Sequence, residues 1–316
     1  MSGSRSSARP LLVIVGPTAI GKTALSLDLA EIFDGEVISA DSRLFYRGMS
    51  IGTAKPSPQE QRAVPHHLID IRSPDETVTL AEYQEMAYAA IDAVLARGRL
   101  PILVGGTGQY VRAVVEGWGI PRVPPQPPLR RALEALGGPE LYRWLQAIDR
   151  EAAQGIHPHN VRRVVRALEV TLVAGRPISE LQRKTSPPYD IFIIGLDADR
   201  DILYRRIDTR VDRMMAAGLL QEVRSLQEAG YAPRLPAMSG LGYRQLGHYL
   251  AGKSTLAEAV ERIKTETHRF VRQQYTWFRR DDPQIHWLEI QEEKVTARAT
   301  ALVRRWLAAL AGTDGE

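Results

Sequence analysis

Short apolar runs recur along the chain and alternate with stretches in which apolar residues return every three or four positions. The apolar runs cover residues 11–15, 36–40, 101–104, 191–196 and 285–290, and helical periodicity follows at residues 23–33 and 80–97. Runs of this length are typical of buried strands, and their alternation with helices indicates a parallel sheet flanked by helices. The predicted fold class is therefore α/β.

The first apolar run leads into GPTAIGKT at residues 16–23, which fits the G-x-x-x-x-G-K-S/T pattern of a phosphate-binding loop. The backbone N–H groups of such a loop and the positive end of the following helix attract phosphate. Lys22 adds a mobile positive charge, and the Thr23 hydroxyl is a candidate ligand for Mg²⁺. The alternative is a tight strand–helix turn without a ligand. The predicted phosphate-binding residues are Gly16, Pro17, Thr18, Ala19, Ile20, Gly21, Lys22 and Thr23.

Two further strand ends carry candidate chemistry, because ligands bind at the carboxyl ends of the strands in parallel sheets. VISADS at residues 37–42 brings Asp41 just past the second strand. ILVGGTGQY at residues 102–110 brings three glycines and Thr107 past the third. Glycines allow the backbone to approach a ligand closely. A plain structural turn is the alternative, but the phosphate loop in the same sheet makes residues 105–108 a plausible second anchor.

A pair of histidines, His66 and His67, lies between these two strand ends. Two histidines invite a metal-site hypothesis, but no third ligand at suitable spacing accompanies them. We therefore expect hydrogen-bonded histidines with a positioning role near the site.

The alternation of apolar runs with helical patterns stops near residue 118. PRVPPQPP at residues 121–128 cannot form a regular helix, and helical patterns follow at residues 129–136, 139–149 and 161–174. The α/β pattern then resumes at the fourth apolar run. We predict a disordered tail at 1–9, the first part of the α/β core at 10–117, a helical insertion at 118–190, and the rest of the core with C-terminal helices at 191–316.

Composition and charge narrow the setting. The chain has 316 residues and no cysteine, so disulfides and cysteine–zinc sites are excluded. No apolar run approaches the roughly 20 residues of a membrane span, and the N-terminus lacks a signal-peptide core, so we expect a cytoplasmic protein without a membrane segment. Residues 118–190 hold 11 Lys and Arg against 7 Asp and Glu, an excess equal to the net charge of +4. A polyanionic partner such as nucleic acid and a solvated basic surface both fit this excess.

Arginine-rich helices are predicted in the insertion and again toward the C-terminus. Arg162 and Arg166 share a helix face, with Arg163 beside them. Residues 203–214 form an Arg-rich helix of the kind that lends an arginine to a transferred group. Residues 256–280 read as one long helix in which basic residues alternate with aromatics, a pattern suited to phosphate contact and base stacking or to a core helix. An amphipathic helix is expected at 295–310.

Taken in order, these landmarks resemble the tRNA dimethylallyltransferase (isopentenyl-diphosphate:tRNA transferase) family. The matching segments are GPTAIGKT (16–23), ISADSRLFY (38–46), IGTAKP (51–56), PHHLID (65–70), ILVGGTGQY (102–110), IHPHNVRRVVRALEV (156–170), GLGYRQ (240–245) and YTWFRR (275–280). The resemblance implies a P-loop NTPase-like sheet with a helical insertion. It also implies transfer of a dimethylallyl group from its diphosphate to the exocyclic amine of the adenosine 3′ to the anticodon in tRNA.

That reaction assigns tasks to the candidate residues. An aromatic amine is a poor nucleophile, and we expect Asp41 to take its proton; a helix cap or a partner of Mg²⁺ is the alternative role. The phosphate loop, Lys22, a Thr23-bound Mg²⁺, Thr107 and an arginine would stabilise the departing diphosphate, with Arg210 chosen and Arg206 as the alternative.

The adenosine must leave the anticodon-loop stack, at a cost of a few kcal/mol that RNA contacts offset. The predicted partners are the tRNA anticodon stem-loop and dimethylallyl diphosphate, and a monomer is the simplest expectation. The predicted tRNA-binding residues are Asp41, Ser42, Arg43, Leu44, Arg162, Arg163, Val164, Val165, Arg166, Gly240, Leu241, Gly242, Tyr243, Arg244, Gln245, Arg272, Gln274, Trp277 and Arg279.

Three other functions compete with tRNA prenylation. A small-molecule kinase needs only the phosphate loop and Mg²⁺ and leaves the basic helices without a task. A prenyltransferase for free adenine nucleotides has no need of the insertion. A non-catalytic RNA-binding NTPase switch gives Asp41 and Thr107 nothing to do.

Overall fold

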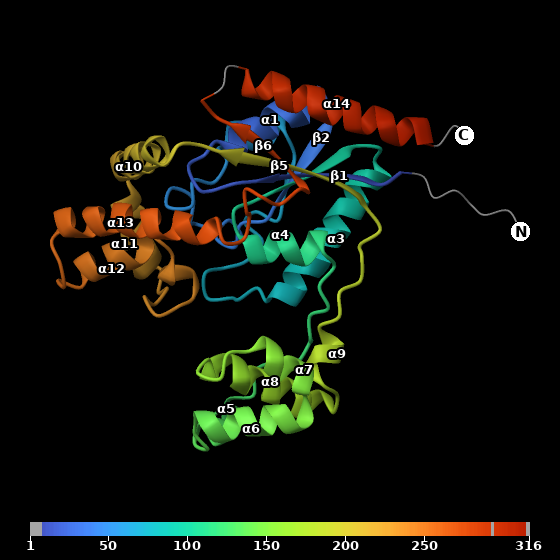
Figure 1. The fold of residues 1–316 in the computed structure, drawn as a ribbon. Helices are drawn as coiled ribbons and strands as arrows, with labels where there is room; N and C mark the ends of the chain where they lie inside the picture. Colours follow the sequence, from blue (N-terminus) through green and yellow to red (C-terminus); the bar gives the residue numbers. More distant parts are fainter. Residues whose placement is uncertain (1–7, 292–293, 314–316) are drawn as a thin grey trace, which may run out of the picture. The chain divides into compact units, whose positions relative to one another are not determined.

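The computed structural model describes residues 8–291 and 294–313 and contains a six-stranded parallel sheet (Figure 1). The strand order is β3–β2–β4–β1–β5–β6. The strands are β1 (Pro10–Val15), β2 (Gly35–Ser39), β3 (His66–His67), β4 (Leu100–Val104), β5 (Asp190–Asp197) and β6 (Ile285–Glu289). Five of them match the predicted apolar runs to within one residue at each end, and the α/β fold class is confirmed. Strand β3 was not predicted, because two residues are too few to show a pattern.

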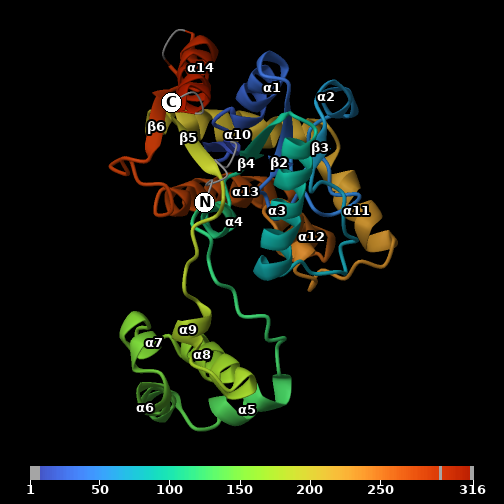
Figure 2. The same cartoon turned by 90° about the vertical axis from the view of Figure 1, so that its right-hand side faces the viewer.

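Strand β1 lies in the middle of the sheet, with Ile14 paired to Val104 on one side and to Ile194 on the other. Residues 11–15 of this strand have no exposed surface. Such burial is expected of a central parallel strand, since helices cover both of its faces. Helices α1 (Lys22–Ile32) and α14 (Val295–Thr313) pack on one face, and α3 (Leu80–Ala96) covers the other (Figures 1 and 2).

The two ends of the chain depart from their predicted boundaries. Residues 1–7 of the predicted tail lie outside the described residues, and Arg9 is held by a hydrogen bond from its N–H to Asp190 Oδ2 at 2.9 Å. Helix α14 runs to Thr313, three residues past its predicted end. Within the described part of the chain, no helix is both long and apolar enough to span a membrane.

A layer of helices follows strand β5. It comprises α10 (Arg200–Ala216), α11 (Leu219–Glu228), the short η1 (Ala237–Ser239), α12 (Tyr243–Leu250) and α13 (Leu256–Gln274). These helices share a core with Tyr46 and Met49, which come from the segment after β2. The long helix predicted for residues 256–280 begins at Leu256 as expected, but α13 ends at Gln274, six residues before the predicted end. The N–H groups of Trp277 and Phe278 both bond to the Gln274 carbonyl in the turn that follows α13. The shorter helices α2 (Pro58–Ala63) and α4 (Gly108–Val115) follow β2 and β4.

Residues 112–187 form a second compact unit; the sequence had indicated a helical insertion at 118–190. The helices after α4 in this unit are α5 (Pro127–Glu134), α6 (Gly138–Ile148), α7 (Arg150–Gly155), α8 (Val161–Ala174) and α9 (Ile178–Leu181). Leu141 and Leu145 of α6 pack with Val164, Val165 and Leu168 of α8 in a core of their own. The periodic patterns at 129–136, 139–149 and 161–174 correspond to α5, α6 and α8.

Candidate active site

The phosphate loop turns between β1 and α1 with three residues at positive φ: Gly16 at 142°, Ala19 at 64° and Gly21 at 112°. A side chain at Gly16 would bring Cβ to 2.6 Å from the Leu196 carbonyl oxygen, which is closer than real contacts allow. The first glycine of the loop is therefore required by both its dihedral angle and its neighbour on β5. Thr18, Ala19 and Lys22 line a cavity in front of the loop.

Lys22 folds back over its own loop. Its Nζ donates hydrogen bonds to the carbonyl oxygens of Gly16, at 2.9 Å, and Pro17, at 2.8 Å. Burial lowers the pKa of Lys22 to about 7; the charge of Asp41 opposes the shift and that of Arg210 adds to it. The lysine therefore changes its charge near neutral pH, and a bound anion would favour its protonated form.

Asp41 leaves strand β2 in a tight turn. Its Oδ1 accepts a hydrogen bond of 2.9 Å from the Arg43 N–H, and its own N–H donates to Ser39 Oγ at 3.2 Å. A carboxylate that bonds the backbone two residues on is fixed in direction. Asp41 lines the same cavity as Lys22.

The glycine turn after β4 closes another side of the cavity. A Cβ at Gly105 would lie 2.4 Å from the Ala40 carbonyl oxygen, and one at Gly108 would lie 2.1 Å from Trp277 Cγ. These glycines allow the turn to lie directly against the segment after β2 and against an indole ring. Thr107 lies between them and lines the cavity.

Gln274 joins the phosphate loop to this glycine turn. Its Oε1 accepts a hydrogen bond from the Thr18 N–H, and its Nε2 donates to the Gly106 carbonyl, each at 2.9 Å. The residue is 5% exposed. Its amide is thus committed to two backbone groups, and the predicted contact between this side chain and tRNA is not supported. A glutamine at the end of a helix carries no sequence signal for such a role.

Of two arginines on α10, one contacts the phosphate loop and the other lines the cavity in front of it. Arg206 Nε donates to the Ala19 carbonyl at 2.9 Å. Arg210 lines the cavity, where burial lowers its pKa against the opposing charge of Asp41. Between the two alternatives from the sequence, Arg210 faces the cavity and Arg206 holds the loop.

The cavity has a volume of about 800 Å³ and is lined by residues of helices α1, α4, α10, α11, α12 and α13 and of the loops beside them. Two carboxylates line it: Glu266, which forms an ion pair with Arg244, and Asp41, which lies in the cavity together with the cations Lys22 and Arg210 and the Thr107 hydroxyl. Predicted site residues that line it are Thr18, Ala19, Lys22, Asp41, Ser42, Arg43, Thr107, Arg210, Gly240, Leu241, Gly242, Tyr243, Arg244, Gln274 and Trp277. Such a cavity is suited to bind an anion at the loop and to take or give a proton at Asp41.

Comparison with known proteins decides the family. The family described as IPP transferase matches residues 44–281. A tRNA dimethylallyltransferase of Roseiflexus castenholzii is 56% identical over 94% of this chain and 98% of its own length. The chain belongs to the IPP transferase family.

Solved structures agree with this assignment. A tRNA isopentenylpyrophosphate transferase from Bacillus halodurans has a TM-score of 0.74 and 39% identity, over 98% of this chain and 100% of that one. A eukaryotic dimethylallyltransferase acting on tRNA has a TM-score of 0.85 and 27% identity, over 96% of this chain and 80% of that one. Both are similar in fold to this chain along nearly its whole length.

In this IPP transferase, Glu222 of α11 supports one wall of the cavity. Its carboxylate accepts hydrogen bonds from the N–H groups of Ser50, Ile51 and Gly52, at 2.7–3.1 Å, and from the Tyr243 hydroxyl at 2.6 Å. The contact ties the segment after Asp41 to the turn at residues 240–245. Sequence reasoning missed Glu222, since an acidic residue on an amphipathic helix looks like a solvated one.

Several predicted RNA-binding residues of this family member are held by the protein itself. The Arg43 guanidinium donates to the carbonyls of Pro236, at 2.7 Å, and Ala237, at 3.2 Å. Arg244 forms an ion pair with Glu266. Leu44 and Gln245 do not line the cavity, and Gln245 caps helix α12 by accepting from the Gly242 N–H at 2.9 Å. Arg272 and Arg279 line a second, separate cavity.

Only some of the tRNA-binding residues predicted on helix α8 of the second unit are exposed. Arg162 and Arg163 are exposed, whereas Val164 and Val165 are buried, so direct contact of these valine side chains with tRNA is not supported. Arg166 donates to the fully buried carboxylate of Glu169 at 2.6 Å and to the Val123 carbonyl at 2.8 Å. Its primary contacts are structural.

The two histidines lie on the outer strand β3 and do not line the cavity of this IPP transferase. His66 Nδ1 is 2.7 Å from the Val64 carbonyl oxygen, and His67 Nε2 is 2.6 Å from Glu36 Oε2. Hydrogen bonds hold both rings, as predicted, but they serve the sheet edge and not the site. Among the described residues, no group of three or more metal-binding side chains occurs.

Proposed function

We propose that this protein transfers a dimethylallyl group from dimethylallyl diphosphate to the exocyclic N6 amine of the adenosine 3′ to the anticodon in tRNA, releasing diphosphate. The observation that carries the proposal is one cavity containing Asp41 together with Lys22 and Arg210 at a phosphate loop. The names of the relatives, tRNA dimethylallyltransferases and tRNA isopentenylpyrophosphate transferases, support the same reaction.

The cationic side of the cavity binds the diphosphate. The loop N–H groups, Lys22 and Arg210 stabilise the negative charge that grows as the C1–O bond of the dimethylallyl group breaks. Thr107 adds a hydroxyl on the side of the glycine turn. Because these donors are held in a partly buried place, they need little reorganisation during the reaction.

Asp41 acts at the opposite end of the transfer. The N6 nitrogen forms a bond to C1 while the C1–O bond breaks, and one N6 proton passes to the Asp41 carboxylate. The hydrogen bond from the Arg43 N–H keeps Asp41 Oδ1 in place during this step. The electron pair of the broken bond leaves with the diphosphate.

Mg²⁺ is part of the proposal as an ion shared between protein and diphosphate. Mg²⁺ binds oxygen ligands and usually keeps several waters, with one or two protein ligands and substrate phosphates. Thr23 is exposed in the first turn of α1 and does not itself line the cavity, but it follows Lys22, which does, and its hydroxyl is the one protein oxygen that the proposal assigns to the ion. When bound, the ion would neutralise charge on the diphosphate.

The RNA side of the proposal rests on exposed basic and aromatic groups. Phe270 and Trp277, 39% and 38% exposed, line the cavity beside Arg269 and offer rings on which an extruded base can stack. Arg162 and Arg163 of the second unit are proposed to contact the RNA backbone. The reaction is placed in the cytoplasm, where its tRNA substrate is found.

The test is to incubate the protein with dimethylallyl diphosphate, Mg²⁺ and unmodified tRNA, and then to digest the RNA to nucleosides for mass spectrometry. We expect prenylated adenosine and stoichiometric diphosphate. In parallel reactions, ATP or free adenosine monophosphate is supplied as the alternative substrate. Consumption of ATP without prenylated adenosine would support a kinase, and prenylation of the mononucleotide alone would support the free-nucleotide enzyme.

A further inference from the structure

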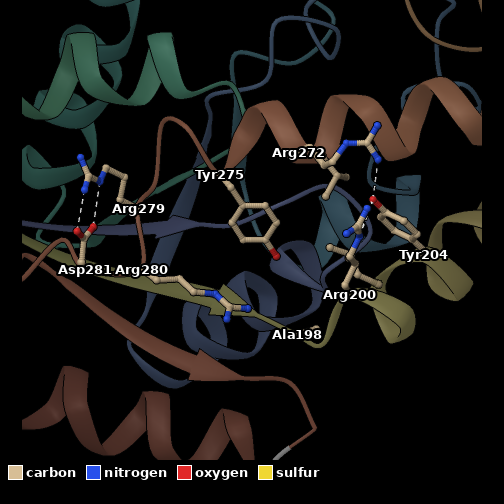
Figure 3. Close-up of a pocket in the computed structure, with 10 residues that line it drawn as sticks. Ala198, Arg200, Tyr204, Arg272, Tyr275, Arg279, Arg280 and Asp281 are labelled. Carbon is tan, nitrogen blue, oxygen red and sulfur yellow. Dashed lines mark hydrogen bonds and ion pairs between the residues drawn. The ribbon is translucent and has the colours of Figure 1, made fainter.

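A second cavity, of about 520 Å³, lies at the carboxyl end of β5 (Figure 3). The first turn of α10, the last turn of α13 and residues 275–281 enclose it. It shares no lining residue with the candidate active site. Four arginines line this cavity against one aspartate: Arg200, Arg272, Arg279, Arg280 and Asp281.

Two of these arginines converge without a carboxylate partner. Arg200 Nε, at 3.1 Å, and an Arg272 terminal nitrogen, at 2.8 Å, both donate to the hydroxyl oxygen of Tyr204. Within the described chain, neither guanidinium forms an ion pair with an acidic side chain. Each has five N–H donors, so most of them are open to an anion. Burial alone would raise the pKa of Tyr204, but the hydrogen bonds from Arg272 and Arg200 outweigh it and lower the pKa.

The positive charge on the other side is already neutralised. Arg279 donates two hydrogen bonds to Asp281, at 3.0 and 2.8 Å, and Arg280 forms an ion pair with Asp197. Figure 3 places the ring of Tyr275 between these two groups of arginines. An anion in this cavity would therefore be drawn to Arg200 and Arg272.

The rest of the cavity is suited to an aromatic group. Tyr275 is fixed because its hydroxyl donates to Asp197 Oδ1 at 2.7 Å, and Ala198, Leu203 and Val271 add apolar surface. A ligand with an anionic end and a flat apolar end matches this division. A nucleotide has both, and unpaired RNA bases stack on aromatic side chains.

We propose that this cavity binds one unpaired nucleotide of the RNA substrate outside the reaction site, with its phosphate on Arg200 and Arg272 and its base on Tyr275. The proposal rests on the proposed function, since it takes RNA as the substrate. It gives Arg200, Tyr204 and Tyr275 a role in holding the RNA while another nucleotide occupies the active site.

The first experiment compares the double variant Arg200→Gln/Arg272→Gln with the control Arg205→Gln/Arg304→Gln, which removes equal charge from exposed positions outside both cavities. The affinity for an unmodified anticodon stem-loop is measured at several salt concentrations. We expect the test variant to bind about 10- to 100-fold more weakly than the wild type, and to lose roughly one counterion from its salt dependence. Equal affinities of the two double variants would overturn the proposal.

A second pair of variants tests the ring without changing charge. Tyr275→Leu is expected to weaken RNA binding about 10-fold, whereas Tyr275→Phe keeps the stacking surface, loses only the hydrogen bond to Asp197 and is expected to lose much less affinity. Melting temperatures of both variants show whether each is folded. If Tyr275→Leu and Tyr275→Phe were equally stable and lost the same RNA affinity, a base stacked on Tyr275 would be contradicted.

A third experiment asks whether the cavity binds a nucleotide of RNA or a free nucleotide. Adenosine monophosphate is titrated into the wild type and into the Arg200→Gln/Arg272→Gln variant. Loss of this binding with unchanged RNA affinity would assign the cavity to a free nucleotide and overturn the proposal. Prenyl transfer by the wild type is measured on the same preparation. If the wild type transferred no prenyl group while the variants still bound RNA more weakly than the wild type, the proposed function would be rejected and the RNA site would stand.

Discussion

The backbone N–H of Thr18 donates a hydrogen bond of 2.9 Å to the side-chain oxygen of Gln274, across 256 residues of sequence. The same amide group bonds the Gly106 carbonyl. One buried side chain therefore sets the separation between the phosphate loop and the glycine turn. Its oxygen also occupies one of the loop N–H groups, which leaves the neighbouring donors for a ligand.

Replacing Gln274 by Met should impair diphosphate binding more than RNA binding. The variant keeps the volume of the side chain but leaves the Gly106 carbonyl without its donor, a loss of about 1–3 kcal/mol. We expect the KM for dimethylallyl diphosphate to rise about 10-fold, with little change in RNA affinity. Gln146→Met, on an exposed position of α6, is the matched control. A change limited to RNA affinity would assign Gln274 to tRNA instead.

The pKa of Lys22, about 7, predicts that the affinity for diphosphate depends on pH. In the free protein the lysine is protonated below pH 7 and neutral above it, and a bound anion raises its pKa. Binding therefore takes up a proton above pH 7, and affinity should fall by up to about tenfold per pH unit there. Calorimetric titration of diphosphate between pH 6 and 9 measures the slope.

Lys22→Arg is the control for this pH dependence, because arginine keeps its charge through the whole range. The titration of the ligand itself is common to both proteins, so only their difference reports on residue 22. Identical pH profiles for the two proteins would mean that Lys22 does not titrate near neutral pH.

Gly108→Ala should disturb the wall formed by Trp277. The new Cβ would meet the base of the indole ring at 2.1 Å, so the ring or the turn must move. We expect RNA affinity and the transfer rate each to fall at least about 10-fold. A displacement of active-site groups by about 1 Å can lower a reaction rate about 100-fold. Gly155→Ala, whose Cβ meets nothing within 4 Å, should leave both unchanged. Wild-type behaviour of Gly108→Ala would remove Trp277 from the site.

Glu169→Gln should destabilise the second unit. Burial would raise the pKa of this carboxylate, but hydrogen bonds from Arg130, the Gln126 N–H and Arg166 lower it to about 2. Breaking such a buried charge pair costs about 3 kcal/mol. Hydrogen exchange of residues 112–187 measures the loss, with the exposed Glu180→Gln as control.

The sign of the corresponding pH effect follows from the lowered pKa of Glu169. Its contribution to stability is complete above the ordinary glutamate range near pH 4.5 and disappears as the pH falls toward 2. Wild type and Glu169→Gln should therefore converge in stability at low pH. A constant difference between them from pH 6 to pH 2 would contradict this charge-based account.

Local patterns were enough to predict the sheet and the loops at its carboxyl edge. The run at residues 11–15 is apolar throughout because β1 is covered on both faces, and Asp41 and Thr107 follow strands whose ends must meet. Long-range contacts were not predictable in this way. The backbone groups that Gln274 and Glu222 hold lie about 170 residues away or more, and nothing in the local pattern identifies them.

The same limit explains the errors on surface residues. Val164 and Val165 share the motif of Arg162 and Arg163, but the helical period turns them into the core of the second unit. Arg166 is basic and lies on a predicted exposed face, yet a buried glutamate one turn away holds it. Which charged residues are free for a ligand depends on packing that the sequence pattern alone does not contain.

The most direct test of the central claim is the single-turnover rate of prenylated adenosine formation by wild type and Asp41→Asn, with both substrates saturating. The asparagine keeps an oxygen that can accept from the Arg43 N–H, but it cannot take the N6 proton. We predict a rate at least about 100-fold lower in the variant, with unchanged affinities for tRNA and diphosphate. An unchanged rate, or a loss confined to tRNA affinity, would contradict the role of Asp41 as the base.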